Sequence, residues 1–243
     1  MVLRADERTD EASTAALWQR NGLLAALPGA EQGRLGPDLE LVDLGLRQLL
    51  YEVDQPITAV YFPVDCVVSV VRLLEGEMPI EVSTVGAEGM AGLPAFLGAD
   101  ISPTRSFCQV PGQALRLGVP ALRRSLAADT GLAALLLRYT QVVMAELAQN
   151  VACTQLHSTE ERCARWLAQT DDRVEGDVFP MTQDFLAQML GVRRATVSLS
   201  ARVLQQAGLI RYTRGRITVV NRDGLRAAAC SCYRTLQREI AKL

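Results

Sequence analysis

Two adjacent arginines, Arg193 and Arg194, follow a glycine in the stretch MTQDFLAQMLGVRRATVSLSARVLQQAGLI, residues 181–210. A guanidinium group is planar and permanently charged, and its rigid fork of N–H donors can bind two acceptors at once. In DNA this fork matches the N7 and O6 acceptors of guanine, which face the major groove. The two arginines therefore indicate recognition of a polyanion or of base edges.

Other residues offer little material for catalysis. The chain has one histidine, His157, at an apparent helix break, where a surface or capping role is expected. We find no nucleophile–base pair and no paired-carboxylate motif, so no enzymatic activity is expected.

The cysteines are scattered and form no CxxC pair. We expect idle or buried thiols in a reducing compartment. The closest two, Cys230 and Cys232, would point to different sides of a helix, so joint metal ligation is not expected. We therefore predict no metal and no cofactor. The six thiols belong to Cys66, Cys108, Cys153, Cys163, Cys230 and Cys232.

The formal net charge of −2 hides a strong asymmetry along the chain. Residues 181–243 contain eleven Lys and Arg against three Asp and Glu, a net charge of +8. The first 180 residues contain fourteen Arg against twenty-four Asp and Glu, a net charge of −10. This division favours a basic end that binds a polyanion over a merely solvated charged face.

The segments around the two arginines predict a helix, a tight turn and a second helix. Thr182 is expected to cap a helix over residues 183–190, and Gly191 permits the sharp turn. The second helix is expected over residues 194–206. Its inward face is predicted to consist of Val197, Ala201 and Leu204, and Gly208 is expected to end it. Such a pair of helices is typical of a helix-turn-helix.

A hairpin is predicted next, over LIRYTRGRITVVN (209–221), with its turn at Thr213-Arg214-Gly215. Motif, charge and hairpin together favour DNA over a protein partner. We assign base readout to Arg193, Arg194, Ser198 and Leu199. We assign phosphate contacts to Gln183, Thr196, Arg202, Arg214 and Arg216.

Upstream, residues 38–118 are rich in Val, Ile, Tyr and Phe, with turn residues such as Glu75-Gly76-Glu77 at intervals of about ten. This spacing predicts a β-sandwich or β-roll. A short amphipathic helix, punctuated by Pro28-Gly29, is expected over residues 21–35. After residues 158–161, a capping box, another helix begins, and an acidic linker is expected over residues 171–180.

Between these parts, a long helix is predicted from about Gly131 to Gln155. Such a helix needs an apolar partner, which is either its own β domain or a copy of itself. The proposed contact stripe consists of Leu132, Leu136, Tyr139, Val143 and Leu147. Apolar runs such as residues 131–137 are too short to span a bilayer, and the N-terminus lacks a signal peptide. We therefore expect a cytoplasmic protein with no membrane contact.

Taken together, the helix-turn-helix, the hairpin RGRITVVNRDGL and the order of elements before them resemble the Crp/Fnr family, the cyclic-AMP-receptor-protein-like transcription regulators. The resemblance implies an α+β fold with a cyclic-nucleotide-binding-like β-roll, a long dimerisation helix and a winged helix-turn-helix. The implied parts are a charged leader (1–20), the β-roll (21–130), the dimerisation helix (131–157), and a winged helix-turn-helix with a C-terminal helix (158–243).

The same resemblance implies a homodimer that binds double-stranded DNA, with RNA polymerase as a further partner. The resemblance favours pairing of the long helix with its copy in a second subunit over packing on its own β domain. The family's recognition helix typically opens Ser-Arg-Glu-Thr-Val and carries a second arginine soon afterwards. Only Arg194 keeps a base-reading identity here, while Leu199 replaces the later arginine and is suited to a thymine methyl.

Cyclic-nucleotide-binding relatives use a Gly-Glu-x-Ala segment followed by Arg-Ser. The matching residues here are Gly92, Leu93, Arg105 and Ser106. Leu93 cannot accept the ribose hydroxyl, and an unpaired buried hydroxyl costs ~1–3 kcal/mol. We therefore expect a degenerate sensor that does not bind cyclic AMP. The alternative is a nucleotide-binding regulator that uses its helix-turn-helix as a scaffold.

An iron–sulfur sensor would need an N-terminal cysteine cluster, whereas the first cysteine is Cys66. The sequence leaves open the operator, the effector and the direction of regulation. It also leaves open the role of the expected C-terminal helix, residues 223–242.

Overall fold

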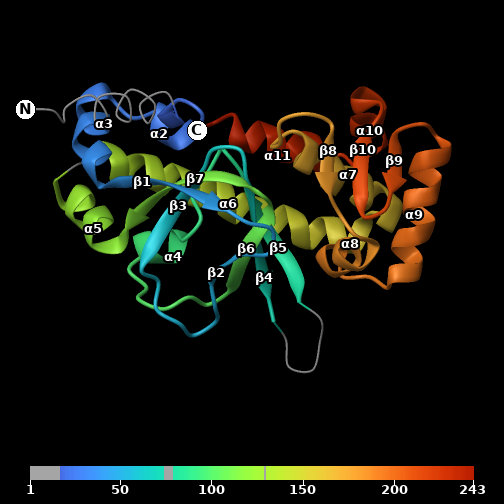
Figure 1. The fold of residues 1–243 in the computed structure, drawn as a ribbon, viewed down its shortest axis with the longest axis horizontal. Helices are drawn as coiled ribbons and strands as arrows, with labels where there is room; N and C mark the ends of the chain where they lie inside the picture. The colour runs from blue at the N-terminus through green and yellow to red at the C-terminus, as the bar shows by residue number, and fades with distance from the viewer. Residues whose placement is uncertain (1–16, 74–78, 129) are drawn as a thin grey trace, which may run out of the picture.

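A computed structural model describes residues 17–73, 79–128 and 130–243. An N-terminal β-roll and a C-terminal helical domain lie at the two ends of one long helix (Figure 1). The mixture of antiparallel sheets, long helix and helix-turn-helix confirms the expected α+β fold class. Most of the expected charged leader and the expected turn at Glu75-Gly76-Glu77 lie outside the described residues.

The β-roll consists of two antiparallel sheets packed face to face. The first has the order β1-β7-β3 and the second β2-β6-β4-β5. The strands are β1 (Leu39–Leu44), β2 (Leu49–Tyr51), β3 (Ala59–Pro63), β4 (Val67–Arg72), β5 (Ile80–Val85), β6 (Arg105–Val110) and β7 (Gly112–Gly118). Their inward residues, including Val60, Phe62, Val68, Leu115 and Leu117, are fully buried. Alternation along these strands explains why their apolar and turn residues predicted the roll.

Short helices close the roll. They are α2 (Gly22–Ala25), α3 (Gly29–Leu35), the 3₁₀ turn η1 (Gly36–Asp38), α4 (Leu93–Phe96) and α5 (Val119–Ala128). The helix expected over residues 21–35 is divided into α2 and α3, and the break lies at Pro28, where the punctuation was expected. Asn21 caps α2, and its buried amide donates to the carbonyls of Pro63 and Gly89. This contact fixes the helical cap to the sheet.

The long helix is α6 (Thr130–Leu156), and its first half packs against the roll. Leu132, Leu136 and Tyr139 are buried in the roll's own core, and Val143 packs against that core. The stripe assigned to a partner helix is therefore largely occupied within the chain. A neighbouring stripe is exposed instead, and we call it the α6 seam: Leu137, Met144, Leu147 and Val151.

By length and mean hydropathy (1.3), Gly131–Leu156 could cross a membrane, although the expectation was that the apolar runs are too short. The expectation considered only the short run of residues 131–137. The uncharged Ala, Thr, Val and Cys residues that follow it extend the apolar stretch to the length of a membrane span. Packing of its first half on the roll accounts for part of this apolar composition, and 28% of the apolar window is buried.

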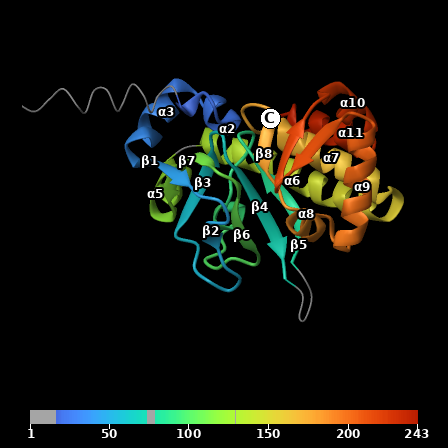
Figure 2. The ribbon, with the colours of Figure 1, turned by 45° about the vertical axis from the view of Figure 1, so that its right-hand side comes forward.

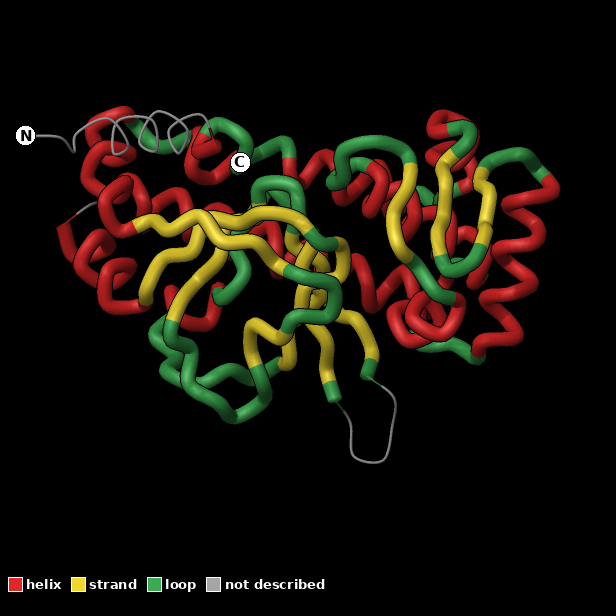
Figure 3. The backbone as a smooth tube through the Cα atoms, in the orientation of Figure 1, coloured by secondary structure: helices red, strands yellow, loops and turns green. Residues whose placement is uncertain are grey.

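The C-terminal domain begins with α7 (Thr159–Asp171), whose capping box is formed by Ser158 and Glu161 as predicted. Then follow β8 (Val178–Pro180), α8 (Gln183–Leu190), α9 (Arg194–Gln206), β9 (Ile210–Thr213), β10 (Arg216–Val219), α10 (Arg222–Ala228) and α11 (Cys232–Ile240). The expected acidic linker thus contains a strand, because residues 178–180 pair with β10. Figure 3 shows the resulting small sheet, ordered β8-β10-β9, beside the helices.

The two domains contact each other along β5. Helix α8 packs beside this strand, and Figure 2 shows the two elements next to each other. Val67, Val71 and Val110 of the roll share one apolar cluster with Trp166, Met189 and Leu190. The shared cluster gives the helix-turn-helix a defined position on the roll.

Candidate nucleic-acid interface

The helix-turn-helix is built by the local signals seen in the sequence. The Thr182 hydroxyl accepts a hydrogen bond from the backbone N–H of Phe185 and caps α8. Gly191 adopts the left-handed conformation (φ 64°) that ends α8, and α9 starts three residues later. The left-handed conformation is unfavourable for any residue that has a Cβ atom. Glycine, which has none, is therefore the residue best suited to this turn.

Helix α9 is clearly two-sided. Val197, Ala201 and Leu204 are buried against α7 and α8, as predicted. The opposite face is open to solvent and includes Leu199, which is 61% exposed. Figure 1 shows α9 at the outer edge of the domain, far from the roll. A helix with such a free face can enter a groove without rearranging its core.

The arginines at the start of α9 are exposed. Arg194 lies 3.5 Å from the carboxylate of Asp184, and both side chains are about two-thirds exposed. Such an open ion pair is weak, so a DNA phosphate or base can replace it. Arg193 precedes the helix and is also exposed. The amino end of α9 thus presents both charges where this motif reads bases.

Two of the predicted contact residues bond to each other. The hydroxyl of Ser198 donates to Oε1 of Gln183 at 2.7 Å, which ties α9 to α8. It also lies 3.0 Å from the carbonyl of Arg194. Both side chains are partly buried. The geometry gives them a positioning role between the helices, and the sequence alone did not predict this bond.

The predicted hairpin is present as β9 and β10. Its turn residues Arg214 and Gly215 both have positive φ, 49° and 76°, as a two-residue turn requires. Arg211, Arg214 and Arg216 project from the hairpin into solvent, and so does Arg202 from α9. Arg211 joins this surface although it was not assigned a contact. Thr196 is only partly exposed.

Charge pairing distinguishes this surface from α10. On α10, Arg222 binds Asp171 and Arg226 binds Asp172. Among the described residues, no carboxylate lies within ion-pair distance of Arg202, Arg214 or Arg216. The positive charge of α9 and the hairpin is therefore available to a polyanion, as is that of Arg234 and Arg238 on α11.

The residues that match the nucleotide-binding segment of the relatives lie in the roll, but the arginine among them already forms an ion pair. Arg105 binds the carboxylate of Glu52 through both Nε and a terminal nitrogen, at 2.7–3.1 Å. This bond is the main reason that the pKa of Glu52 lies below its ordinary value. Ser106 is buried. At Gly92 (φ 96°), a side chain would collide with the Tyr51 hydroxyl, which lies 2.9 Å from the carbonyl oxygen of Ala59 and 3.1 Å from that of Ala91.

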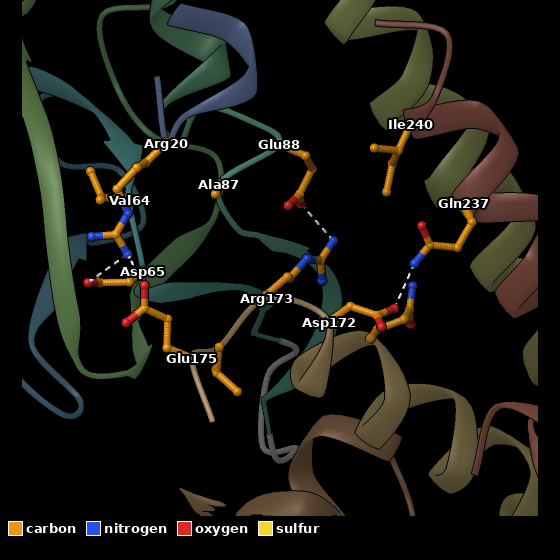
Figure 4. A pocket seen from close by; sticks show the side chains of 12 residues that line it. Arg20, Val64, Asp65, Ala87, Glu88, Asp172, Arg173, Glu175, Gln237 and Ile240 are labelled. Atoms are coloured by element: carbon orange, nitrogen blue, oxygen red, sulfur yellow. Dashed lines mark hydrogen bonds and ion pairs between the residues drawn. The ribbon is translucent and has the colours of Figure 1, made fainter. Parts of the chain in front are cut away.

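A charged cavity of about 390 Å³ lies where the roll meets the C-terminal domain (Figure 4). Arg173 is almost buried and binds Glu88 at 2.7 Å. Arg20 binds both Asp65 and Glu175. Because these cations are paired with carboxylates across the junction, they join the two domains.

Comparison with known proteins identifies the C-terminal domain. Residues 161–228 match the family model of the Crp-like helix-turn-helix domain. No curated protein matches the sequence.

Solved structures share the fold of nearly the whole chain. FixK2 from Bradyrhizobium japonicum is 18% identical, with 79% of this chain and 98% of that one covered at a TM-score of 0.66. A putative regulator of the Crp/Fnr family from Eubacterium rectale is 14% identical, with 90% and 99% covered at a TM-score of 0.66. The c-di-GMP-responsive regulator CLP from Xanthomonas campestris is 13% identical, with 79% and 99% covered at a TM-score of 0.63.

Proposed function

We propose that this chain, whose residues 161–228 form a Crp-like helix-turn-helix domain on the fold of the Crp/Fnr regulators, is a sequence-specific DNA-binding transcription regulator. The observation that carries the proposal is the free face of α9, with exposed arginines at its amino end and an arginine-bearing hairpin beside it. A scaffold with no nucleic-acid role would have no need for this concentration of unpaired positive charge.

The proposed DNA contacts fall into two groups, those to base edges inside the major groove and those to the phosphates at its rim. Arg193 and Arg194 enter the major groove first, where a guanidinium group reads guanine. Leu199, one turn further along α9, meets an apolar feature such as a thymine methyl. Arg202 and the hairpin residues Arg214 and Arg216 bind phosphates, which fixes the register of the helix in the groove. Thr196 and the amino end of α9 complete the phosphate contacts.

The protein acts as a homodimer through the α6 seam. Leu137, Met144 and Val151 are spaced by seven residues, and each is about 60% exposed or more. Apolar residues at heptad spacing are typical of two helices that pair along their length. Two α9 helices then reach successive major grooves, about 34 Å apart, on a near-palindromic site.

The β-roll does not bind cyclic AMP in this proposal. Leu93 offers no acceptor to a ribose hydroxyl, and Glu52 already occupies the guanidinium that would hold a cyclic phosphate. A cyclic phosphate would have to displace the bidentate Glu52 carboxylate from Arg105. The displaced carboxylate would then lie beside the negative charge of the phosphate. The roll is thus a degenerate sensor.

The same assignment makes the protein a cytoplasmic regulator with RNA polymerase as its expected protein partner. It performs no catalysis in this proposal, in keeping with the regulators whose fold it shares.

Selection of bound sequences from a random DNA pool, followed by fluorescence anisotropy, tests the DNA-binding function. We expect an enriched near-palindrome and an affinity for it at least about a thousandfold above that for unrelated DNA. A purified chain that binds no DNA at low ionic strength would refute the proposal. Calorimetry with cyclic AMP, cyclic GMP and cyclic di-GMP tests the sensor, and tight binding that an Arg105→Ala substitution abolishes would favour the nucleotide-binding alternative.

A further inference from the structure

Four metal-ligating side chains converge where the C-terminal helices meet the end of α6. One of them lies near the end of α6 and a second directly after that helix. The third lies in the link before α11, and the fourth is the first residue of α11. Their ligand atoms all lie within 4.8 Å of one another. We call this group the Cys3His cluster: Cys153, His157, Cys230 and Cys232.

Local structure explains the convergence. Cys153 and His157 are one helical turn apart, on the same side of α6. The expectation that Cys230 and Cys232 diverge is wrong, because α10 ends at Ala228 and Cys230 lies in the link before α11. Ala229 in that link has an extended backbone (φ −70°, ψ 147°). The helical geometry that would separate the two thiols therefore does not apply.

The distances suit one metal ion. The sulfurs of Cys153 and Cys230 are 3.5 Å apart, and so are the Cys232 sulfur and Nδ1 of His157. With Zn–S bonds of about 2.3 Å, a tetrahedron places its sulfurs about 3.8 Å apart. The separations in the cluster exceed this edge by at most about 1 Å, a shift that rotation of the side chains can supply.

The surroundings are those of a closed structural site. The three cysteines are buried, with at most 4% of their surface exposed, and His157 is partly exposed. The amide of Gln149 lies 2.9 Å from the Cys232 sulfur and donates to it, as an outer partner of a bound thiolate does. No disulfide joins the described cysteines.

Positive charge also surrounds the cluster. Arg162 and Arg165 on α7 interact electrostatically with Cys153 and Cys230. Arg165 is 8% exposed, and its Nε has no hydrogen-bond partner among the described residues. Three thiolates and one divalent ion leave a net charge of −1, which these guanidinium groups offset.

We propose that the Cys3His cluster binds one zinc ion in a tetrahedral site that fixes α11 to the end of α6. Thiolate and imidazole ligands favour Zn²⁺ over the hard cations Mg²⁺ and Ca²⁺. Four protein ligands leave no open position, so the site is structural. The ligand pattern in the sequence is a Cys-x-x-x-His followed some seventy residues later by a Cys-x-Cys.

The full chain, purified with a reductant that does not bind metal, is tested for metal by mass spectrometry after reconstitution with Zn²⁺ and removal of excess ion. We expect about one zinc per chain. Replacement with Co²⁺ should give the visible absorption and sulfur-to-metal charge transfer of a tetrahedral thiolate site. Zinc should also raise the melting temperature, because it binds the folded chain.

His157→Ala removes one ligand at a partly exposed position, where misfolding is not expected. It should lower zinc affinity at least about tenfold. His157→Cys supplies a fourth thiolate and should restore binding, which a merely structural histidine would not explain. Cys66→Ala, which removes a buried thiol in the roll, is the matched control and should keep full zinc content.

Three outcomes would overturn the proposal. The first is a folded, reduced wild-type chain that retains no zinc. The second is equal zinc in the wild type and in His157→Ala combined with Cys232→Ser. The third is a disulfide between Cys153 and Cys230 that forms readily in the presence of excess Zn²⁺, since a bound ion would protect both thiolates.

Discussion

The indole Nε1 of Trp166 donates a 2.5 Å hydrogen bond to Oε1 of Glu81. This bond joins α7 of the DNA-binding domain to β5 of the roll. The other carboxylate oxygen of Glu81 accepts from the hydroxyl of Ser69. Burial raises the pKa of Glu81 to about 7, although both hydrogen bonds lower it. The domain junction therefore contains a carboxyl group that titrates near neutral pH.

The junction should weaken as pH rises from about 4.5 to about 7. In this range the folded chain holds a proton on Glu81 that the unfolded chain has lost, so rising pH favours unfolding. Burial also raises the pKa of Glu146, which acts in the same direction. Glu81→Gln cannot ionise. Its amide oxygen can still accept from Trp166, while its amide nitrogen would donate to the Ser69 hydroxyl, which can then donate to Gln109. Denaturant melts from pH 5 to pH 8 should show this variant gaining stability relative to the wild type as pH rises.

Glu160→Gln is the matched control, because Glu160 is an exposed glutamate on the same helix as Trp166. It should leave the pH dependence of the unfolding free energy unchanged. A stability difference between Glu81→Gln and the wild type that is constant across this range would contradict the assignment.

Arg194→Ala should relax base preference at one position of the selected site. Loss of a bidentate contact costs ~1–3 kcal/mol, or about fivefold to 150-fold in affinity for the preferred base. Affinity for unrelated DNA should fall much less. Anisotropy titrations against the site and its single-base variants measure both effects. Arg234→Ala, an exposed arginine on α11, is the control, and an equal loss in the two variants would remove Arg194 from base readout.

Arg214→Asn should weaken binding to all DNA by a similar factor. Asparagine tolerates the left-handed backbone of this turn (φ 49°), so the hairpin keeps its shape while one phosphate contact is lost. The slope of log affinity against log salt should become shallower by about 0.9. A change confined to one sequence would show that this residue reads bases instead.

The helix-turn-helix was predictable because its signals are local. Thr182, Gly191 and the inward residues of α9 each act within a few positions of the chain, and all three have their predicted roles. β8 was missed because three residues in an acidic segment form a strand only by pairing with β10. The bond between Gln183 and Ser198 depends on the packing of two helices, which periodicity does not specify.

Long-range relations explain two further differences between the sequence expectations and the structure. Helix α6 is apolar on most of its surface, so its sequence does not reveal which stripe meets the roll and which stays free. Leu136 and Leu137 are neighbours, yet the first is fully buried and the second is 60% exposed. Likewise, Cys153 and Cys230 are 77 residues apart, and only the folding of α11 onto α6 brings their sulfurs together.

The exposed stripe on α6 makes the dimer testable. Met144→Glu combined with Val151→Glu places four like charges per dimer in the proposed seam, where their repulsion and desolvation oppose pairing. We expect a shift from dimer to monomer in analytical ultracentrifugation, with an unchanged circular dichroism spectrum, because both side chains are exposed within one chain. Affinity for a palindromic site should fall more than affinity for its half-site.

Arg138→Glu is the matched control, since Arg138 is exposed on the same helix but points about 100° away from Leu137 around the helix axis. It should remain dimeric. If instead Leu132→Ala separates the subunits while the double variant stays dimeric, the stripe first predicted from the sequence is the true interface. The packing of Leu132 on the roll argues against that result, because its loss should lower the unfolding free energy by about 2–5 kcal/mol and leave the dimer contact intact.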